Sequence, residues 1–393
     1  MRATLLLIGI AALSSVAFAA ADAGLSKQFI FPLQEKHVHA SSVVELPNGD
    51  LLAVWFHGSG ERTADDVLLQ GARLRRGATE WSDVFVMADV PDFPDCNPVL
   101  WIDEEERLWL FWVVVLANRW ENSLLKYRRA TEYLEDGPPH WDWQDVIHLR
   151  PGEDFPEQLA EGFRELAYPE PMWAEYAHPY TRMLIEASRD KLKRQIGWMT
   201  RNQPLHLDSG RILLPLYSDG FNISLMAYSD DGGERWHTSA PIVGLGPIQP
   251  SIAQRTDGSL VAFFRDSGPQ PKRIHRAEST DDGETWTLTR NTDLPNPSAS
   301  VEVKTLADGR WILIYNDTES GRHSLAVALS EDEGDTWPIM RHLHQTPEGE
   351  GRFSYPSIIQ TRDGTIHATY THQTAPGNTI VHASFAPGWV AGE

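Results

Sequence analysis

The stretches SDDGGERW at 229–236, STDDGETW at 279–286 and SEDEGDTW at 330–337 decide the fold. All three share the pattern S-x-D-x-G-x-x-W and recur at a spacing of about 50 residues. In such a turn the aspartate accepts hydrogen bonds from nearby backbone, the glycine adopts a positive φ, and the tryptophan offers a large apolar contact. A motif that returns at constant spacing predicts a repeated structural unit.

A β-hairpin precedes each of these motifs, and the same hairpin occurs three more times in the chain. Each copy is an apolar strand, a turn that usually contains Asp-Gly or Asn-Gly, and a second apolar strand. The copies begin at His39, Asn97, Gln203, Gln249, Ser298 and Tyr355. Six hairpins with their outer strand pairs predict an all-β, six-bladed β-propeller. We expect residues 29–32 and 379–385 to pair and so close the ring.

Two segments do not follow the repeat. The second and third hairpins are about 50 residues farther apart than the others, and apolar residues at helical spacing predict a helical insertion at about 150–200. Residues 1–19 combine Arg2, an apolar run and an Ala-Phe-Ala site at 17–19, which is typical of a secretory signal peptide. The propeller is therefore expected to span 20–393 and to be secreted or periplasmic.

The charge and composition of the chain narrow the classes of molecule that it is expected to bind. The formal net charge is −21, which disfavours nucleic acid and anionic membranes as partners. No later run of about 20 apolar residues follows the leader, so no membrane anchor is expected. The single cysteine, Cys96, allows no internal disulfide and is interpreted as a buried small residue. His37 and His39 lack an evident third ligand, so neither a metal nor another cofactor is predicted.

Candidate site residues follow from the propeller geometry. The inner strands begin on the face that usually binds ligands, so the six residues that open the hairpins should converge on the axis. The loops after the second strand of each hairpin reach the same region. They contribute Glu61, Asp65, Asp66, Arg265, Asp266, Asn316 and Arg322.

Nearly the whole propeller resembles the exo-α-sialidase family, in which the S-x-D-x-G-x-x-W motif is called the Asp-box. The likeness is closest to a branch of predicted neuraminidases, through His39-Ala40-Ser41, Asn97-Pro98 and Asn296-Pro297. The resemblance implies a terminal acidic sugar as substrate, with three arginines that hold its carboxylate. It also implies a tyrosine nucleophile, a glutamate that activates it, and an aspartate as acid/base. A neutral phenol suits this substrate because the carboxylate beside the anomeric carbon does not repel it.

Transferred to this chain, the resemblance assigns two arginines and the nucleophile. Arg265 matches the second arginine, Arg322 the third, and Tyr355 the nucleophile. The acid/base position falls in the loop SGERTADDV, where Asp65 is the first choice and Asp66 and Glu61 follow closely.

Two positions depart from the family pattern. His39 stands where sialidases carry the first arginine, and Arg201 is a candidate replacement. Gln249 stands where they carry the glutamate, and a neutral amide cannot accept the proton of tyrosine. Glu302 is a candidate for that role.

Three interpretations therefore stay open. The first is a sialidase-like exo-glycosidase. The second is another hydrolase or lyase for acidic polysaccharide, with His39 as general base. The third is a propeller that binds glycans without chemistry.

Overall fold

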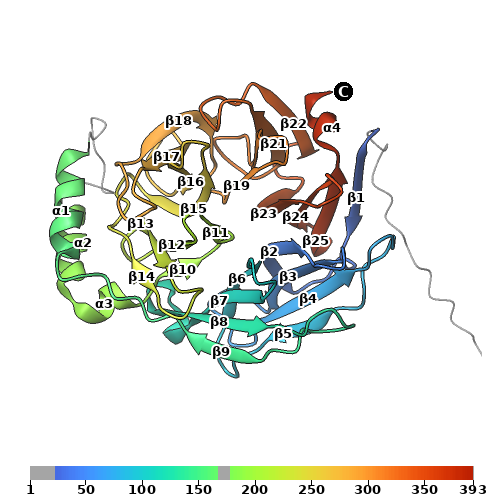
Figure 1. Ribbon diagram of the computed structural model, residues 1–393, viewed down its shortest axis with the longest axis horizontal. Helices are drawn as coiled ribbons and strands as arrows, with labels where there is room; N and C mark the ends of the chain where they lie inside the picture. Colours follow the sequence, from blue (N-terminus) through green and yellow to red (C-terminus); the bar gives the residue numbers. More distant parts are fainter. Residues whose placement is uncertain (1–22, 167–177, 393) are drawn as a thin grey trace, which may run out of the picture.

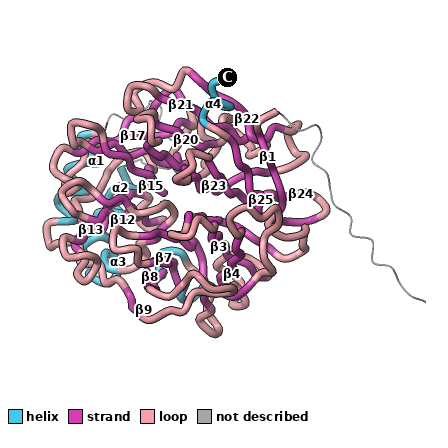
Figure 2. Tube along the Cα trace, turned by 45° about the vertical axis from the view of Figure 1, so that its right-hand side comes forward, coloured by secondary structure: helices cyan, strands magenta, loops and turns pink. Residues whose placement is uncertain are grey.

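The chain forms six antiparallel sheets around a central axis, as the computed structural model of residues 23–166 and 178–392 shows (Figure 1). The predicted six-bladed β-propeller is confirmed. Strands joined by loops build the ring, as Figure 2 also shows; five blades are four-stranded sheets and blade three has five strands. The predicted signal peptide lies outside the described residues.

The blades follow one another in chain order. Blade one contains β2 (His37–Glu45), β3 (Leu51–Gly58), β4 (Leu68–Leu74) and β5 (Phe85–Ala88). Blade two contains β6 (Asp95–Ile102), β7 (Leu108–Val115), β8 (Ser123–Ala130) and β9 (Trp143–Val146). Blade three contains β10 (Met199–Thr200), β11 (Leu205–His206), β12 (Ile212–Ser218), β13 (Ile223–Ser229) and β14 (His237–Thr238).

The second half of the ring is more regular. Blade four contains β15 (Pro247–Gln254), β16 (Leu260–Asp266), β17 (Arg273–Ser279) and β18 (Arg290–Pro295). Blade five contains β19 (Glu302–Thr305), β20 (Trp311–Tyr315), β21 (Ser324–Ser330) and β22 (Ile339–Gln345). Blade six contains β23 (Arg352–Gln360), β24 (Ile366–Thr374), β25 (Gly377–Phe385) and β1 (Leu25–Phe29), and the short helix α4 (Pro387–Ala391) follows.

The two ends of the chain close the ring. The N-terminal strand β1 pairs antiparallel with β25, from Leu25 opposite Phe385 to Phe29 opposite Val381. The backbone N–H of Ile30 continues this ladder by donating to the carbonyl of Ile380 at 2.9 Å. The predicted closure is therefore present, with an N-terminal strand that begins a few residues earlier than expected.

The Asp-boxes are compact turns that pack against a neighbouring blade. In the second box, Ser279 Oγ accepts the N–H of Gly283 at 3.1 Å and Asp281 Oδ1 accepts the N–H of Thr285 at 3.0 Å. The box glycines have φ between 81° and 89°. A Cβ on Gly233 would lie 2.6 Å from the ring of Trp109, in blade two. Glycine is thus required both for the turn and for the close approach of the blades.

The predicted helical insertion lies between blades two and three. It contains α1 (Phe155–Glu165), α2 (His178–Arg189) and α3 (Lys191–Gln195), which Figure 1 places at the outer rim beside blade three. Phe155 anchors α1 through edge contacts with Trp198 and Phe221, at centroid distances of 6.1 and 5.8 Å. None of the described helices is long and apolar enough to span a bilayer. Two 3₁₀ turns, η1 (Leu116–Asn118) and η2 (Trp120–Asn122), connect β7 to β8.

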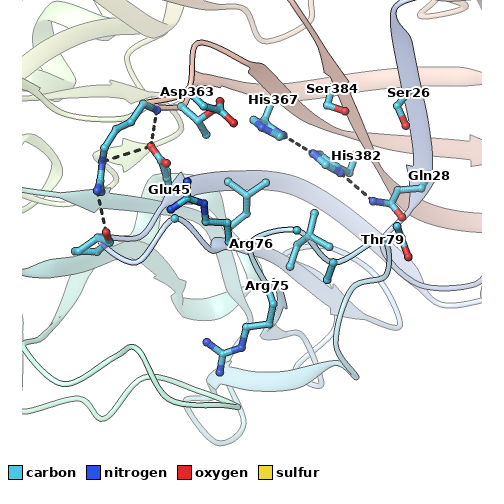
Figure 3. A pocket seen from close by; sticks show the side chains of 18 residues that line it. Ser26, Gln28, Glu45, Arg75, Arg76, Thr79, Asp363, His367, His382 and Ser384 are labelled. Carbon is cyan, nitrogen blue, oxygen red and sulfur yellow. Dashed lines mark hydrogen bonds and ion pairs between the residues drawn. The ribbon is translucent and has the colours of Figure 1, made fainter.

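Buried histidines surround the closing strand. A pocket of about 420 Å³ opens between blades six and one, on the face where the inner strands end. In it, Figure 3 shows His367, His382 and Gln28 in a row, with 2.9 Å between His367 Nδ1 and His382 Nε2. Burial and the charge of His367 lower the pKa of His382 to about 3. Burial and the charge of Lys27 lower the pKa of His372 to about 4 and help to lower that of His344 to about 3.

Acid should therefore weaken the closure of the ring. The unfolded chain binds protons at these histidines near pH 6.5 and the folded chain does not, so stability falls as the pH drops from about 6.5 toward 4. Each histidine contributes at most about 1.4 kcal/mol per pH unit. The urea midpoint should decrease over this range, and His382→Gln should reduce the slope. The exposed His140→Gln serves as control. A midpoint independent of pH, or equal slopes in both variants, would contradict this account.

Candidate active site

The inner strands share a bulge at the end where they begin. The register shifts between His39 and Ser42, Cys96 and Val99, Ile248 and Ser251, and Ser354 and Ser357. In each bulge one residue adopts a left-handed backbone with φ between 52° and 56°: Ala40, Asn97, Gln249 and Tyr355. Ser298 in blade five has a similar φ of 58°. Such a backbone costs a non-glycine residue of order 1 kcal/mol. The repeated bulge brings side chains distant in the sequence together at the axis.

Tyr355 stands at the centre of the site. Its phenol oxygen accepts hydrogen bonds from Arg265 Nη1 at 2.7 Å and from Gln249 Nε2 at 3.0 Å. In the described part of the chain no carboxylate forms a hydrogen bond with this phenol. Gln249 thus occupies the position next to the tyrosine that the resemblance gives to glutamate, but it contacts the oxygen as a donor.

Tyr217 provides a second phenol, which shares the amide of Gln249 with Tyr355. Gln249 Nε2 also donates to Tyr217 Oη at 3.2 Å, and Asn97 Nδ2 donates to the same oxygen at 3.0 Å. Burial, with the nearby charge of Asp219, raises the pKa of Tyr217 well above its ordinary value. Tyr217 therefore stays neutral and, with Asn97, fixes the amide that contacts Tyr355. Tyr217 was not among the predicted site residues.

Three arginines surround the ring of Tyr355. The guanidinium carbons of Arg201, Arg322 and Arg265 lie 5.0, 5.5 and 6.0 Å from its centroid. Arg201 is 2% exposed and donates to the carbonyls of Ser41 at 3.3 Å and Pro356 at 2.8 Å. Its burial separates it from any ligand, so the geometry does not support Arg201 as the replacement for a substrate-binding arginine. Its guanidinium group instead packs against the ring of Tyr355 and holds the backbone next to it.

Arg265 and Arg322 are the guanidinium groups at the open side. Ser298 holds both: Arg265 Nε and Nη2 donate to its Oγ at 3.2 and 3.1 Å, and Arg322 Nη2 donates to its carbonyl at 2.7 Å. Burial lowers the pKa of Arg322 to about 10. Within the described residues neither arginine forms an ion pair. Two fixed, unpaired guanidinium groups in a strongly acidic chain form a site for an anion.

His39 lies against the other side of Tyr355. The two ring centroids are 4.0 Å apart, and His39 Nδ1 is 2.9 Å from Thr371 Oγ1. Burial, with the charges of His37 and the arginines, lowers the pKa of His39 well below its ordinary value. The imidazole is therefore neutral, and it packs beside the phenol where the resemblance would place an arginine.

The three acidic candidates of blade one differ in their surroundings. Asp66 binds Lys36 Nζ and the N–H of Ser59, both at 2.9 Å, and these bonds hold its pKa well below the ordinary value. Asp65 is exposed and accepts a bond from Asn118 at 2.9 Å. Glu61 Oε1 lies 3.4 Å from His37 Nε2. Burial disfavours the charged form of Glu61, but the close contact and charge of His37, and then the charge of Arg322, lower its pKa below the ordinary value. Of the three, Glu61 and not the first choice Asp65 is the carboxylate that interacts with Arg322.

Asp219 is a second carboxylate near the arginines, and the sequence interpretation missed it. It follows β12 in blade three, in a loop of the type that supplied the other candidates. Asp219 is exposed to solvent, but protein atoms around it desolvate the carboxylate and raise its pKa. Arg265 opposes the rise, and Glu61 adds to it.

The remaining candidates support the fold around the site. Glu302 Oε2 accepts the N–H of Ile358 at 3.0 Å, so this carboxylate holds the backbone of β23 instead of contacting the phenol. Gln203, Asn316 and Asp266 likewise bond to backbone groups: Gln203 to the carbonyls of Val43 and Leu100, Asn316 to those of Ser324 and Phe353, Asp266 to the N–H groups of Gly268 and Arg273.

Metal ligands do not gather here. Across residues 23–166 and 178–392, no three His, Cys, Asp or Glu side chains are grouped to hold a metal ion. Cys96 is buried and unpaired, and burial raises the pKa of its thiol, which makes it unreactive.

Comparison with known families identifies this architecture. The sequence model of the BNR repeat-like domain matches residues 49–199 and 186–368, which is more than half of the chain. The chain belongs to the BNR repeat-like domain family. It is thereby a member of the sialidase superfamily, as the sequence resemblance indicated. A sialidase of Paraclostridium sordellii is 28% identical over 161 residues, which cover 35% of this chain and 39% of that protein. This BNR-family chain therefore matches about two fifths of that relative's length.

Solved structures share the fold. A protein of unknown function from Dyadobacter fermentans superposes with a TM-score of 0.66 and 16% identity, over 92% of this chain and 99% of that one. The NanB sialidase of Streptococcus pneumoniae gives 0.66 and 13%, over 92% and 70%. A leech intramolecular trans-sialidase gives 0.67 and 13%, over 93% and 71%. At such identities the likeness establishes the propeller alone.

The position of Arg201 leads to a prediction about stability. Arg201→Met should remove the guanidinium and leave the carbonyls of Ser41 and Pro356 without donors, at a cost of about 2 kcal/mol or more. The exposed Arg119→Met is the control, since its side chain is 70% exposed. Urea unfolding measures both. A stability of Arg201→Met within about 0.5 kcal/mol of the parent would contradict a supporting role for this buried cation.

Proposed function

We propose that the protein is a glycoside hydrolase that removes a terminal acidic sugar, such as sialic acid, from glycans. The observation that carries the proposal is the tyrosine at the axis, whose oxygen accepts bonds from Arg265 and Gln249 beside a second unpaired guanidinium group. Membership of the sialidase superfamily supports it. Secretion or export to the periplasm, where glycans are accessible, belongs to the same proposal.

Arg265 and Arg322 bind the carboxylate of the sugar in this account. A guanidinium group presents a planar pair of donors that fits a carboxylate, and both groups are held in place by Ser298. The bound carboxylate fixes the sugar with its anomeric carbon next to Tyr355 Oη. The neutral His39 adds no charge on the other side of the ring.

Tyr355 attacks the anomeric carbon as the phenolate, after release of its proton to solvent. The N–H groups of Arg265 and Gln249 stabilise the negative oxygen, which replaces activation by a carboxylate base. The new bond joins Oη to the anomeric carbon as the bond to the leaving oxygen breaks. Water later hydrolyses this glycosyl–tyrosine intermediate.

Asp219 donates the proton to the leaving oxygen. Two neighbouring carboxylates whose surroundings shift their pKa values apart are suited to acid and base roles. The pKa of Asp219 is raised and that of Glu61 is lowered, so of the two carboxylates Asp219 is the one suited to carry the proton. The negative charge of Glu61 favours the protonated form of Asp219.

Turnover of a fluorogenic α-sialoside tests these roles. Tyr355→Phe should lower kcat/KM about a thousandfold or more, and Asp219→Asn about a hundredfold or more, with loss of the alkaline limb of the pH profile. Asp65→Asn serves as the matched control because this carboxylate is exposed and bonds to Asn118. Loss of activity in Asp65→Asn with retention in Asp219→Asn would overturn the assignment of the acid.

A propeller that binds acidic glycans without cleaving them is the second candidate. The observation in its favour is Gln249, since no carboxylate of residues 23–166 and 178–392 bonds to the phenol of Tyr355. This candidate predicts that the parent protein binds sialosides but does not turn them over. It also predicts that Gln249→Glu introduces measurable turnover by supplying the missing base. Turnover by the parent protein would exclude it.

A further inference from the structure

A groove of about 600 Å³ begins at the two substrate-facing arginines and runs outward between blades five and six. Arg265, Pro297, Ser298 and residues 321–323 line the part next to the site, and residues 348–352 and 373–375 complete the lining. Its volume lies within the range of about 300–1,000 Å³ that is usual for ligand sites. The groove is thus continuous with the site of the acidic sugar and extends beyond it.

Arg352 is the third guanidinium group of this groove. It opens β23, three residues before Tyr355, and its side chain is exposed. Within the described residues it forms neither an ion pair nor a side-chain hydrogen bond, although many other arginines of this acidic chain are paired with carboxylates. Its charge reaches Arg322, whose pKa it helps to lower. A cation left unpaired next to two others favours an anionic ligand.

The other polar groups of the groove suit a sugar. Glu348, Glu350 and Gln373 of its lining offer acceptors and donors for hydroxyl groups. The arginines therefore suit the acidic groups of a ligand, and these three side chains suit its hydroxyl groups. A single sugar held by Arg265 and Arg322 at Tyr355 leaves Arg352 and this outer part of the groove unfilled.

We propose that the outer groove is a subsite for a second sugar of the same glycan, and that Arg352 selects an acidic group on that sugar. The proposal rests on the proposed function and makes it more specific: the substrate is a glycan with acidic groups on two consecutive sugars. Arg352 binds this second group and takes no part in bond cleavage.

Calorimetric titration of the Tyr355→Phe protein, which keeps the groove, tests the subsite. The probes are α2,8-linked disialic acid, with two acidic sugars, and 3′-sialyllactose, with one. The first should bind about fivefold more tightly, as expected for one additional exposed charge pair. Adding Arg352→Ala should abolish this preference and leave the affinity for sialyllactose within about twofold. Adding Arg235→Ala, which removes an 84% exposed arginine of an Asp-box, should preserve it.

The outcomes separate the two proposals. Binding of both probes with equal affinity, or a preference that survives Arg352→Ala, would overturn the subsite and leave the proposed function in place. Failure of both probes to bind, with the fold intact by circular dichroism, would overturn the subsite and the proposed function together.

Discussion

The site depends on a backbone constraint, the left-handed residue in the bulge of the inner strands. A regular strand would alternate its side chains between the two faces of a blade and would not direct them to the axis. The bulge at Gln249 and at Tyr355 releases one side chain from that alternation in each blade. Two residues 106 positions apart then meet in one hydrogen bond. The strain at these positions is small compared with the packing of the blades that imposes it.

Electrostatics then determines which chemistry is possible at Tyr355. Three arginines surround the phenol, and two carboxylates from the loops of blades one and three interact with those at the open side, Glu61 with Arg322 and Asp219 with Arg265. The guanidinium group of Arg201 donates its hydrogen bonds to buried backbone carbonyls, whereas Arg265 and Arg322 keep N–H donors for a ligand. Three other buried neighbours of Tyr355, which are Tyr217, Gln249 and His39, are neutral. A negative charge on the phenol oxygen or on a bound sugar is therefore compensated by cations that are already in position.

The period of the hairpins and Asp-boxes was sufficient to predict the ring, its closure and the insertion, because each rests on local turn chemistry and strand patterning. The same period placed Gln249 and Tyr355 together. It could not show that the inner strand of blade three is divided between β10 and β11, which buries Arg201. Nor could it show that Asp66 turns back to Ser59 while Glu61 remains near the arginines. Loop conformation decides these choices, and it also brings Asp219, in the corresponding loop of blade three, close enough to interact with Arg265.

The role of Tyr355 as the nucleophile is tested most directly by trapping its covalent intermediate. A 3-fluorinated sialosyl fluoride reacts readily with a glycosidase nucleophile and then hydrolyses slowly, so the adduct accumulates. The account predicts an intact-mass increase of one fluorosialosyl group, located by peptide mapping on Tyr355 and absent in Tyr355→Phe. No adduct, or an adduct on another residue, would contradict it.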